Sequence, residues 1–257
     1  MTLSYATMGI LALATLWTTA ILVAGAAWQD LRDVFRLHRH ARRSRKATIL
    51  PGTIAEWRVE QRGRALDAKD ETIAFHDRTF GSTLEGALRI DGKDCRACGS
   101  VEVWVTPSER AKAAACADTT TFQAAYAQAV KAAGWSREVR VRLGEGTVVH
   151  VLGELDGGDL AGANGLPLIV SSFDPTSQLV TQGLTLLGFI IIELVACAAV
   201  TSVSLMPPHL GPRSIVGAVL GLGFFLGVTP LGVALRERVR RPAESYLRGT
   251  WSRAHTA

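Results

Sequence analysis

Charged residues are missing from three long stretches of this 257-residue sequence. Residues 6–27 and 214–235 carry none, and residues 175–208 carry only Glu193. A helix needs about 20 apolar residues to cross the hydrocarbon core of a bilayer. The sequence therefore predicts an α+β membrane protein with three transmembrane helices and excludes a purely soluble chain.

Motifs of several enzyme classes are also missing. The sequence has no P-loop, no dinucleotide-binding fingerprint and no H-E-x-x-H pair, and no G-x-S-x-G surrounds Ser171. No catalytic residue and no cofactor is therefore expected. The remaining chemistry must come from the four cysteines, the intramembrane acid and the charged segments beside the membrane.

The charges that are present divide the chain into segments. The expected order is a first transmembrane helix, a basic juxtamembrane segment, a β-rich soluble domain, two more transmembrane helices and a basic tail. These segments cover residues 1–28, 29–47, 48–177, 178–204, 214–235 and 236–257, respectively.

Positive charge predicts the orientation of these segments in the membrane. Residues 29–46 carry seven Lys/Arg against two acids, and residues 236–253 carry six against two. Such clusters stay on the cytoplasmic side. We therefore expect the N-terminus outside the cell (inner or plasma) membrane, with residues 29–178 and the C-terminus cytoplasmic. The first span could instead be a signal peptide, but no basic residue precedes it.

The net charge of +5 hides a split between the membrane flanks and the soluble domain. Residues 48–177 carry 14 Lys/Arg and 18 Asp/Glu, a net charge of −4. The basic character of the chain therefore belongs to the flanks, and no nucleic-acid partner is expected.

The juxtamembrane segment has the pattern of a helix that continues the first span. Trp28, Leu31 and Phe35 recur at three- and four-residue spacing. A second stripe holds four arginines: Arg32, Arg36, Arg39 and Arg43. A basic amphipathic helix of this kind binds anionic lipid headgroups. The alternative is a flank whose arginines only set the orientation.

The soluble domain alternates in the manner of short strands around a helical insertion. Strands are expected in residues 49–60, 86–90, 100–105, 137–143, 146–155 and 166–172. Helices are expected in residues 106–116, capped by Ser108, and 121–135. This pattern predicts a small OB-like β-barrel or sandwich.

The sequence LGEGTVVHVLGELDG, followed by LPLIVSSFDP and an apolar span, resembles the C-terminal half of a GIDE-type domain. The matching positions are Gly144, Gly146, Val149, Val151, Gly153, Leu155, Leu168, Ile169 and Ser171. The resemblance implies an OB-like barrel framed by transmembrane helices, as in prokaryotic relatives of the mitochondrial membrane-anchored RING ubiquitin ligase. A RING domain binds its metal ions through eight Cys/His ligands, and this sequence has four cysteines and only a short segment after the third span. No ubiquitin-ligase activity is therefore expected.

Cys95 and Cys98 form a C-x-x-C pair within DGKDCRACG, which is expected to be a turn between two strands. Such a pair occurs in zinc sites and in redox dithiols. Cys116 and His76 are the nearest further metal ligands, and neither belongs to a second close pair. Three interpretations stay open: a zinc site, a dithiol oxidoreductase, and a turn without metal or redox chemistry.

Glu193 belongs to a polar stripe of the second span. Gln182, Glu193, Cys197 and Ser204 fall on one helical face. An ionised carboxylate in the bilayer is costly, so Glu193 is expected to face protein as a neutral acid. It would hold helices together within one chain or between chains, or act as a proton or cation relay. In the third span Gly217, Gly221, Gly223 and Gly227 form two G-x-x-x-G motifs that allow close helix packing.

Together these features favour a bacterial-type membrane protein whose cytoplasmic domain binds or scaffolds a protein or lipid partner. Homo-oligomerisation is compatible with the glycine motifs. Two other functions stay open: a dithiol or zinc enzyme centred on Cys95 and Cys98, and a small channel or transporter subunit that uses Glu193.

Overall fold

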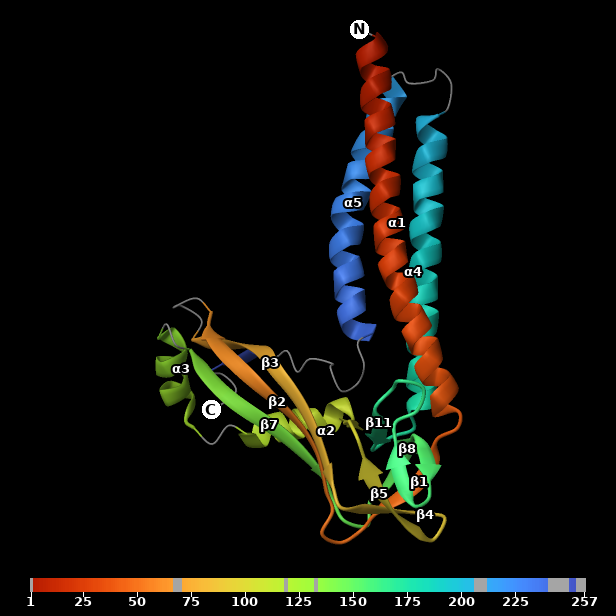
Figure 1. Cartoon of the computed structure of the whole chain (residues 1–257). Coiled ribbons are helices and arrows are strands. Elements are labelled where there is room, and N and C mark those ends of the chain that lie inside the picture. Colours follow the sequence, from red (N-terminus) through yellow and green to blue (C-terminus); the bar gives the residue numbers. More distant parts are fainter. Residues whose placement is uncertain are drawn as a thin grey trace. The chain divides into compact units, whose positions relative to one another are not determined.

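The chain has an α+β fold that divides into two compact units (Figure 1). The computed structural model describes residues 2–66, 71–117, 120–131, 134–205, 212–239 and 250–252. The helical unit comprises Met1–Arg39 and Thr176–Val239, and the β-rich unit comprises His40–Pro175 and Arg240–Ala257.

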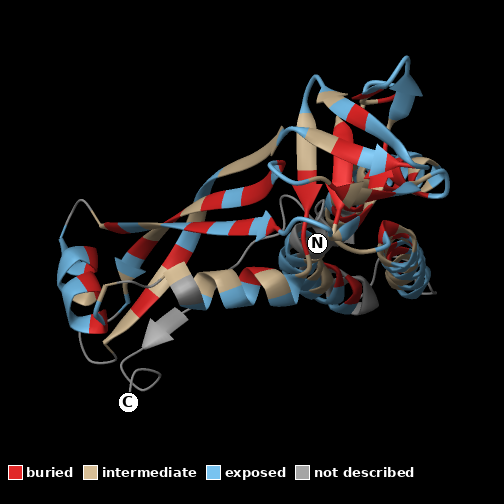
Figure 2. Cartoon of the chain, turned by 90° about the horizontal axis from the view of Figure 1, so that it is seen from below, coloured by how far each residue is buried: buried red, intermediate tan, exposed pale blue. Residues whose placement is uncertain are grey.

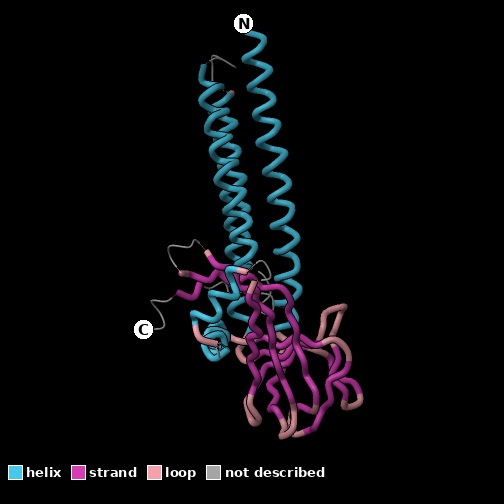
Figure 3. Tube along the Cα trace, turned by 90° about the vertical axis from the view of Figure 1, so that its left-hand side faces the viewer, coloured by secondary structure: helices cyan, strands magenta, loops and turns pink. Residues whose placement is uncertain are grey.

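Three long helices form the helical unit and run side by side (Figures 1 and 3). They are α1 (Thr2–Ala41), α4 (Pro175–Ser204) and α5 (Pro212–Val239). Two of them, over Gly9–Ala41 and Pro175–Ser204, are long and apolar enough to cross a membrane. The apolar stretch described in α5, Val219–Leu235, is shorter.

The first helix continues without a break into the basic juxtamembrane segment. With 40 residues, α1 is about 60 Å long, roughly twice the thickness of a bilayer core. Leu16 and Ala20 of α1 pack with Cys197 of α4 in one apolar cluster. Trp17 Nε1 of α1 donates a hydrogen bond to Thr201 Oγ1 of α4 at 2.9 Å. These contacts hold α1 and α4 antiparallel.

Eight strands of the β-rich unit form one sheet in the order β6-β11-β8-β1-β4-β5-β10-β9. The strands are β1 (Arg45–Ile49), β4 (Ala87–Ile90), β5 (Lys93–Cys98), β6 (Val101–Trp104), β8 (Val148–Leu152), β9 (Glu154–Asp156), β10 (Asp159–Ala161) and β11 (Leu168–Ser171). A two-residue turn, Asp91-Gly92, joins β4 to β5. Both turn residues have positive φ, as a type I′ hairpin requires.

The second sheet has the order β12-β3-β2-β7. Its strands are β2 (Ile54–Ala65), β3 (Thr72–Glu85), β7 (Trp135–Leu143) and β12 (Thr250–Ser252). The register between β2 and β3 shifts after the pair Glu60↔Thr79, because the next pair is Gln61↔Asp77. Arg78 is therefore the extra residue of a β-bulge.

One hydrophobic core serves both sheets, and buried residues alternate with exposed ones along the strands (Figure 2). Trp57, Val59 and Val139 of the four-stranded sheet join Leu88 and Val149 of the eight-stranded sheet in this core. Helix α2 (Pro107–Ala117) packs beside β7. Helix α3 (Phe122–Val130) covers a second cluster with Ile73, Phe75 and Trp135 at the far end of the four-stranded sheet.

Several expectations from the sequence need correction. The strands form two open sheets, and the described residues contain no closed barrel. Strand β3 was not expected, and the cysteine pair lies on a strand, β5, instead of in a turn. The cap of α2 is Thr106 instead of Ser108: the Glu109 backbone N–H donates to Thr106 Oγ1 at 3.2 Å, and the Thr106 N–H donates to Glu109 Oε2 at 2.7 Å.

Most of the basic tail lies outside the described residues. Residues 236–239 end α5, and β12 pairs antiparallel with β3 through Thr250↔Ala74 and Ser252↔Thr72. Residues 250–252 of the tail are therefore part of a sheet, which the expectation of a simple basic flank did not include.

Candidate functional site

The polar residues of α4 lie mostly on its buried face. Glu193 is 2 % exposed, Cys197 is 0 % exposed and Ser204 is 4 % exposed. Gln182 is half-buried. The expected polar stripe therefore faces the interior of the helical unit.

Glu193 is buried between helices of the helical unit. Its Oε2 has no hydrogen-bond partner among the described residues. The expected role of Glu193 in holding helices together stays a prediction.

The glycines of α5 divide into a packed pair and an open pair. A Cβ at Gly217 would clash with Ser204 Oγ, and one at Gly221 would lie 3.7 Å from Val200 Cγ1. A Cβ at Gly223 or Gly227 would meet no described atom within 4 Å. The second motif therefore does not mediate packing in the described part of the chain.

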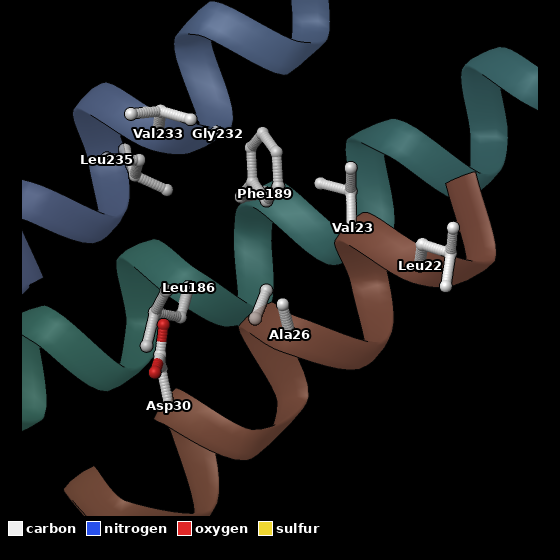
Figure 4. Close-up of a pocket in the computed structure, with 10 residues that line it drawn as sticks. Leu22, Val23, Ala26, Asp30, Leu186, Phe189, Gly232, Val233 and Leu235 are labelled. Atoms are coloured by element: carbon white, nitrogen blue, oxygen red, sulfur yellow. The ribbon is translucent and has the colours of Figure 1, made fainter. Parts of the chain in front are cut away.

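The helical unit contains an apolar cavity of about 210 Å³ between its three helices (Figure 4). Val23 and Ala26 of α1 line it together with Phe189 of α4, and Gly232 of α5 approaches Phe189 closely. Asp30 is the charged residue of the lining. Gly232 was not singled out from the sequence, because it belongs to neither G-x-x-x-G motif.

The arginine stripe beside the first span is exposed, as its sequence pattern suggested. Arg32, Arg36 and Arg39 are exposed on α1, and Arg43 is exposed just after the helix ends. Of the apolar residues expected beside this stripe, Trp28 and Phe35 are 53 % and 54 % exposed, whereas Leu31 is buried. The buried positions of this part of α1 are Leu31, Val34 and Leu37.

The two cysteines of the C-x-x-C pair point to opposite sides of β5. Cys95 is fully buried in the core, whereas Cys98 is exposed. Successive strand residues alternate between faces, so two residues three apart cannot converge on one ion. His76 lies exposed on β3, the Cys116 side chain is outside the description, and the described residues contain no cluster suited to a metal.

The clearest concentration of chemistry lies on the four-stranded sheet, where the sequence predicted no site. Strands β2, β3 and β7 turn arginines to one side while their apolar residues enter the core. We call this side the arginine-rich face; its residues are Arg58, Arg62, Arg64, Arg78, Arg140 and Arg142. Arg62 is half-buried and the others are exposed.

The strand register places like charges opposite one another on this face. Arg58 pairs with Arg140, and Arg62 pairs with His76. Like charges at directly opposite positions destabilise a sheet. The Arg58–Arg140 pair is therefore unfavourable for folding, whereas Arg142 lies directly opposite Glu56 on the same face.

Glutamates balance part of the arginine-rich face. Arg142 Nη2 lies 3.2 Å from Glu56 Oε2, and Arg140 Nη2 lies 2.5 Å from Glu138 Oε2. Arg78 Nη1 is 4.0 Å from Glu60 Oε1. These acids gather toward the middle of the face and toward the eight-stranded sheet.

Two surface hollows on this sheet differ in charge. The first, of about 540 Å³, includes Arg58 and Arg137 but also Glu60 and Glu138. The second, of about 670 Å³, lies at the end of the sheet near α3. Its charged lining is Arg62, Arg64, Arg78 and Lys131, with His76 beside them and no carboxylate among the described lining residues.

A buried arginine fastens α2 beneath the sheet. The Arg110 guanidinium carbon lies 4.9 Å from the centre of the Trp57 ring, and Arg110 Nη2 donates to the Val105 carbonyl at 3.1 Å. Burial lowers the pKa of Arg110 to about 10, although the charges of Asp77 and Glu109 oppose the shift. Arg110 therefore stays charged at neutral pH.

A second buried network crosses the same sheet. Arg137 lies 3.6 Å from the centre of the Phe75 ring and donates from Nε to Gln61 Oε1 at 2.9 Å. Gln61 Nε2 donates in turn to Asp77 Oδ1 at 2.7 Å. The inward polar groups are thus used in packing, and the outward arginines are the ones that face solvent.

The carboxylate that caps α2 also ties it to the last strand of the large sheet. Burial would raise the pKa of Glu109, but hydrogen bonds from the Thr106 hydroxyl and N–H and from the Ser172 hydroxyl outweigh it. The charge of Arg110 adds to the same effect. The pKa of Glu109 therefore lies below its ordinary value.

No protein family, curated protein or solved structure matches this chain. Its function must therefore be inferred from its own geometry, and the arginine-rich face offers the most specific chemistry.

Proposed function

We propose that the chain is a multi-pass membrane protein whose β-rich unit binds a protein or lipid partner at the cytoplasmic surface of the membrane. The arginine-rich face is the observation that carries this proposal. It concentrates six arginines on one side of a domain whose sequence, over residues 48–177, has a net charge of −4. A partner with anionic groups is the natural complement of such a face.

The pairing of β12 with β3 supports three transmembrane spans. Strands in one sheet lie on the same side of a membrane, so the chain between Pro175 and Thr250 must cross an even number of times. Helix α4 is long and apolar enough to cross. If α4 crosses, α5 must cross back, and α1 adds the third span.

The basic clusters support the orientation with the β-rich unit in the cytoplasm. Residues 29–46 and the tail carry most of the positive charge that flanks the spans. The exposed Trp28 and Phe35 beside Arg32, Arg36 and Arg39 suit the headgroup region of an anionic membrane. We also retain the relation to GIDE-type, OB-like domains as part of this proposal.

Thiol labelling in intact cells tests the orientation. In a variant with Cys116→Ser and Cys197→Ala, the exposed Cys98 is the thiol that should react and the buried Cys95 should react slowly. A membrane-impermeant maleimide should label this variant only after permeabilisation. Labelling of intact cells would place the β-rich unit outside and overturn the orientation.

Site-specific photo-crosslinking in native membranes tests the binding function. A photoreactive residue at Arg140 should give protein or lipid adducts that disappear at high salt, because exposed charge interactions are screened. The same residue at Asp91, exposed on the eight-stranded sheet, is the matched control. Equal adducts from both positions, or none from Arg140, would contradict binding at the arginine-rich face.

A proton- or cation-binding role of Glu193 is a second candidate function. It is favoured by the burial of Glu193 without a hydrogen-bond partner for Oε2 among the described residues. Purified chain reconstituted in vesicles should then conduct protons, and Glu193→Gln should abolish the flux while the protein remains folded. Equal flux in both proteins would exclude this role.

A further inference from the structure

The hollow at the end of the four-stranded sheet combines groups from three elements. Strand β2 contributes Arg62 and Arg64, strand β3 contributes Arg78, and Lys131 directly follows α3. Its apolar part includes Tyr126 of α3, whose ring stacks on Phe122 with 5.9 Å between ring centres. Rigid elements on several sides thus define this hollow.

Local backbone geometry brings the arginines to this place. A Cβ at Gly134 would lie 2.9 Å from Arg62 Nε, and Gly134 has a φ of +70° that other residues rarely adopt. Glycine therefore lets the chain after α3 approach the Arg62 guanidinium. His76 and Arg78, two residues apart on β3, both face outward, and His76 lies directly opposite Arg62.

The charges of this hollow are less balanced than those on the rest of the face. Arg64 and Lys131 form no ion pair with a described residue, and Arg78 reaches Glu60 only at 4.0 Å. The neighbouring hollow on the same sheet holds two glutamates among its lining residues. An anion bound here would relieve the repulsion among Arg64, Arg78 and Lys131, beside which the described lining of the hollow places no carboxylate.

We propose that this hollow binds the phosphate group of a small phosphorylated molecule, an inference that rests on the proposed binding function of the β-rich unit. Arginine matches phosphate because its planar fork donates two parallel hydrogen bonds, and lysine adds a point charge. The Tyr126 ring and the Val130 side chain supply an apolar wall for the organic part of the ligand. A lipid headgroup and a soluble phosphate ester share this chemistry.

Titration calorimetry on the full chain in neutral detergent tests the proposal with two probes. Dihexanoyl phosphatidic acid represents the lipid headgroup, and inorganic pyrophosphate represents a soluble phosphate. Saturable binding of at least one probe is expected, and it should weaken as salt is raised. Tighter binding of phosphatidic acid assigns the site to lipid, and tighter binding of pyrophosphate assigns it to a soluble ligand.

Two variants of equal chemistry localise the binding. Arg64→Gln combined with Lys131→Gln should weaken binding at least about tenfold, because two charge-assisted hydrogen bonds are lost. Arg89→Gln combined with Arg96→Gln removes the same charge from exposed positions of the eight-stranded sheet, outside the arginine-rich face, and should change affinity less than about threefold.

Three outcomes would overturn the inference: no saturable binding of either probe, equal losses in both double variants, or equal binding of dihexanoyl phosphatidylcholine. If photo-crosslinking at Arg140 still succeeds in that case, the proposed binding function stands and the phosphate site alone is wrong. If both experiments fail, the proposed function fails with it.

Discussion

The two sheets of the β-rich unit share one hydrophobic core but distribute their exposed charges differently. The outward residues of the four-stranded sheet are dominated by arginine. The eight-stranded sheet and its turns mix both signs: the exposed acids Asp91, Asp94, Glu154, Asp156 and Asp159 occur with the exposed bases Arg45, Lys46, Arg89, Lys93 and Arg96. Arg89 is bound to Asp94, with 2.7 Å between Nε and Oδ1. The net charge of −4 over residues 48–177 therefore hides the local concentration of arginines on the four-stranded sheet.

The two sheets also differ in how they are held to the core. The eight-stranded sheet contributes apolar side chains such as Leu88, Ile90 and Val149. The four-stranded sheet is also held by buried polar groups: Arg110 of α2 against Trp57, and the Gln61–Arg137 pair within the sheet. The four-stranded sheet therefore uses charged groups both in its buried contacts and on its solvent-facing side. The eight-stranded sheet is stabilised mainly by the burial of apolar side chains.

Removal of the buried guanidinium should produce the largest effect. Arg110→Ala is expected to lower the free energy of unfolding by about 3–5 kcal/mol, because Asp77 and Glu109 lose their buried counter-charge. Urea unfolding of the purified chain, followed by tryptophan fluorescence, measures this loss. Lys112→Ala, exposed on the same helix, should change stability by less than about 0.5 kcal/mol. Equal losses of unfolding free energy in both variants would contradict the view that the four-stranded sheet depends on a buried charge.

Truncation in the large sheet should act through lost packing alone. Leu88 is 0 % exposed on β4, so Leu88→Ala should cost about 2–5 kcal/mol of unfolding free energy. The loss should not vary between pH 3 and pH 6, since no titrating group is removed. Val148→Ala on the neighbouring β8 region, where Val148 is 55 % exposed, serves as the control in the same urea experiment. A strong pH dependence of the Leu88 effect would speak against purely apolar stabilisation.

Acid should weaken the attachment of α2. The folded-state pKa of Glu109 is depressed below its ordinary value of 4.5. Its contribution to stability is therefore fully present above that value and is lost as pH falls through the folded-state pKa. Melting temperatures measured from pH 6 downward should fall less steeply for Glu109→Gln than for the unmodified chain. Glu154→Gln, on an exposed residue of the large sheet, should leave the slope unchanged.

The smallest effect on stability is expected for the outward arginines. Arg58→Gln with Arg140→Gln should shift the melting temperature by less than about 2 °C, as is usual for exposed positions. The same variant should nevertheless elute from a cation-exchange column at clearly lower salt. Arg89→Gln with Arg96→Gln removes equal charge from the large sheet and should shift elution less. Identical shifts would mean that the arginine-rich face has no special potential.

The sequence predicted the elements whose pattern is uninterrupted. The long apolar runs marked the three helices, and REVRVRL marked β7 because its apolar and charged residues alternate strictly. Strand β3 was missed because the bulge at Arg78 breaks this alternation: Ile73 and Phe75 face inward before it, and Phe80 and Leu84 pack inward after it. The alternation of apolar and polar residues that identifies a strand in the sequence is lost where the bulge inserts one extra residue.

The candidate site could be predicted only in fragments. Outward arginines at 140 and 142 follow from the alternation of β7, but their meeting with Arg58 depends on the pairing of β2 with β7. The C-x-x-C pair shows the opposite error. The strand begins directly after the tight Asp91-Gly92 turn, which leaves Cys95 inside and Cys98 outside. Local motifs suggest chemistry, but strand register decides which side chains meet.

The pairing of β12 with β3 also links the order of synthesis to folding. Residues 72–74 of β3 are made long before residues 250–252, and both α4 and α5 are made in between. This part of the β3 edge therefore stays unpaired while the last two helices are synthesised, and an open edge is prone to pair wrongly. The sheet can be completed only after the C-terminal strand has been returned to the side of β3. The synthesis of α4 and α5 thus sets the earliest time at which the β-rich unit is finished.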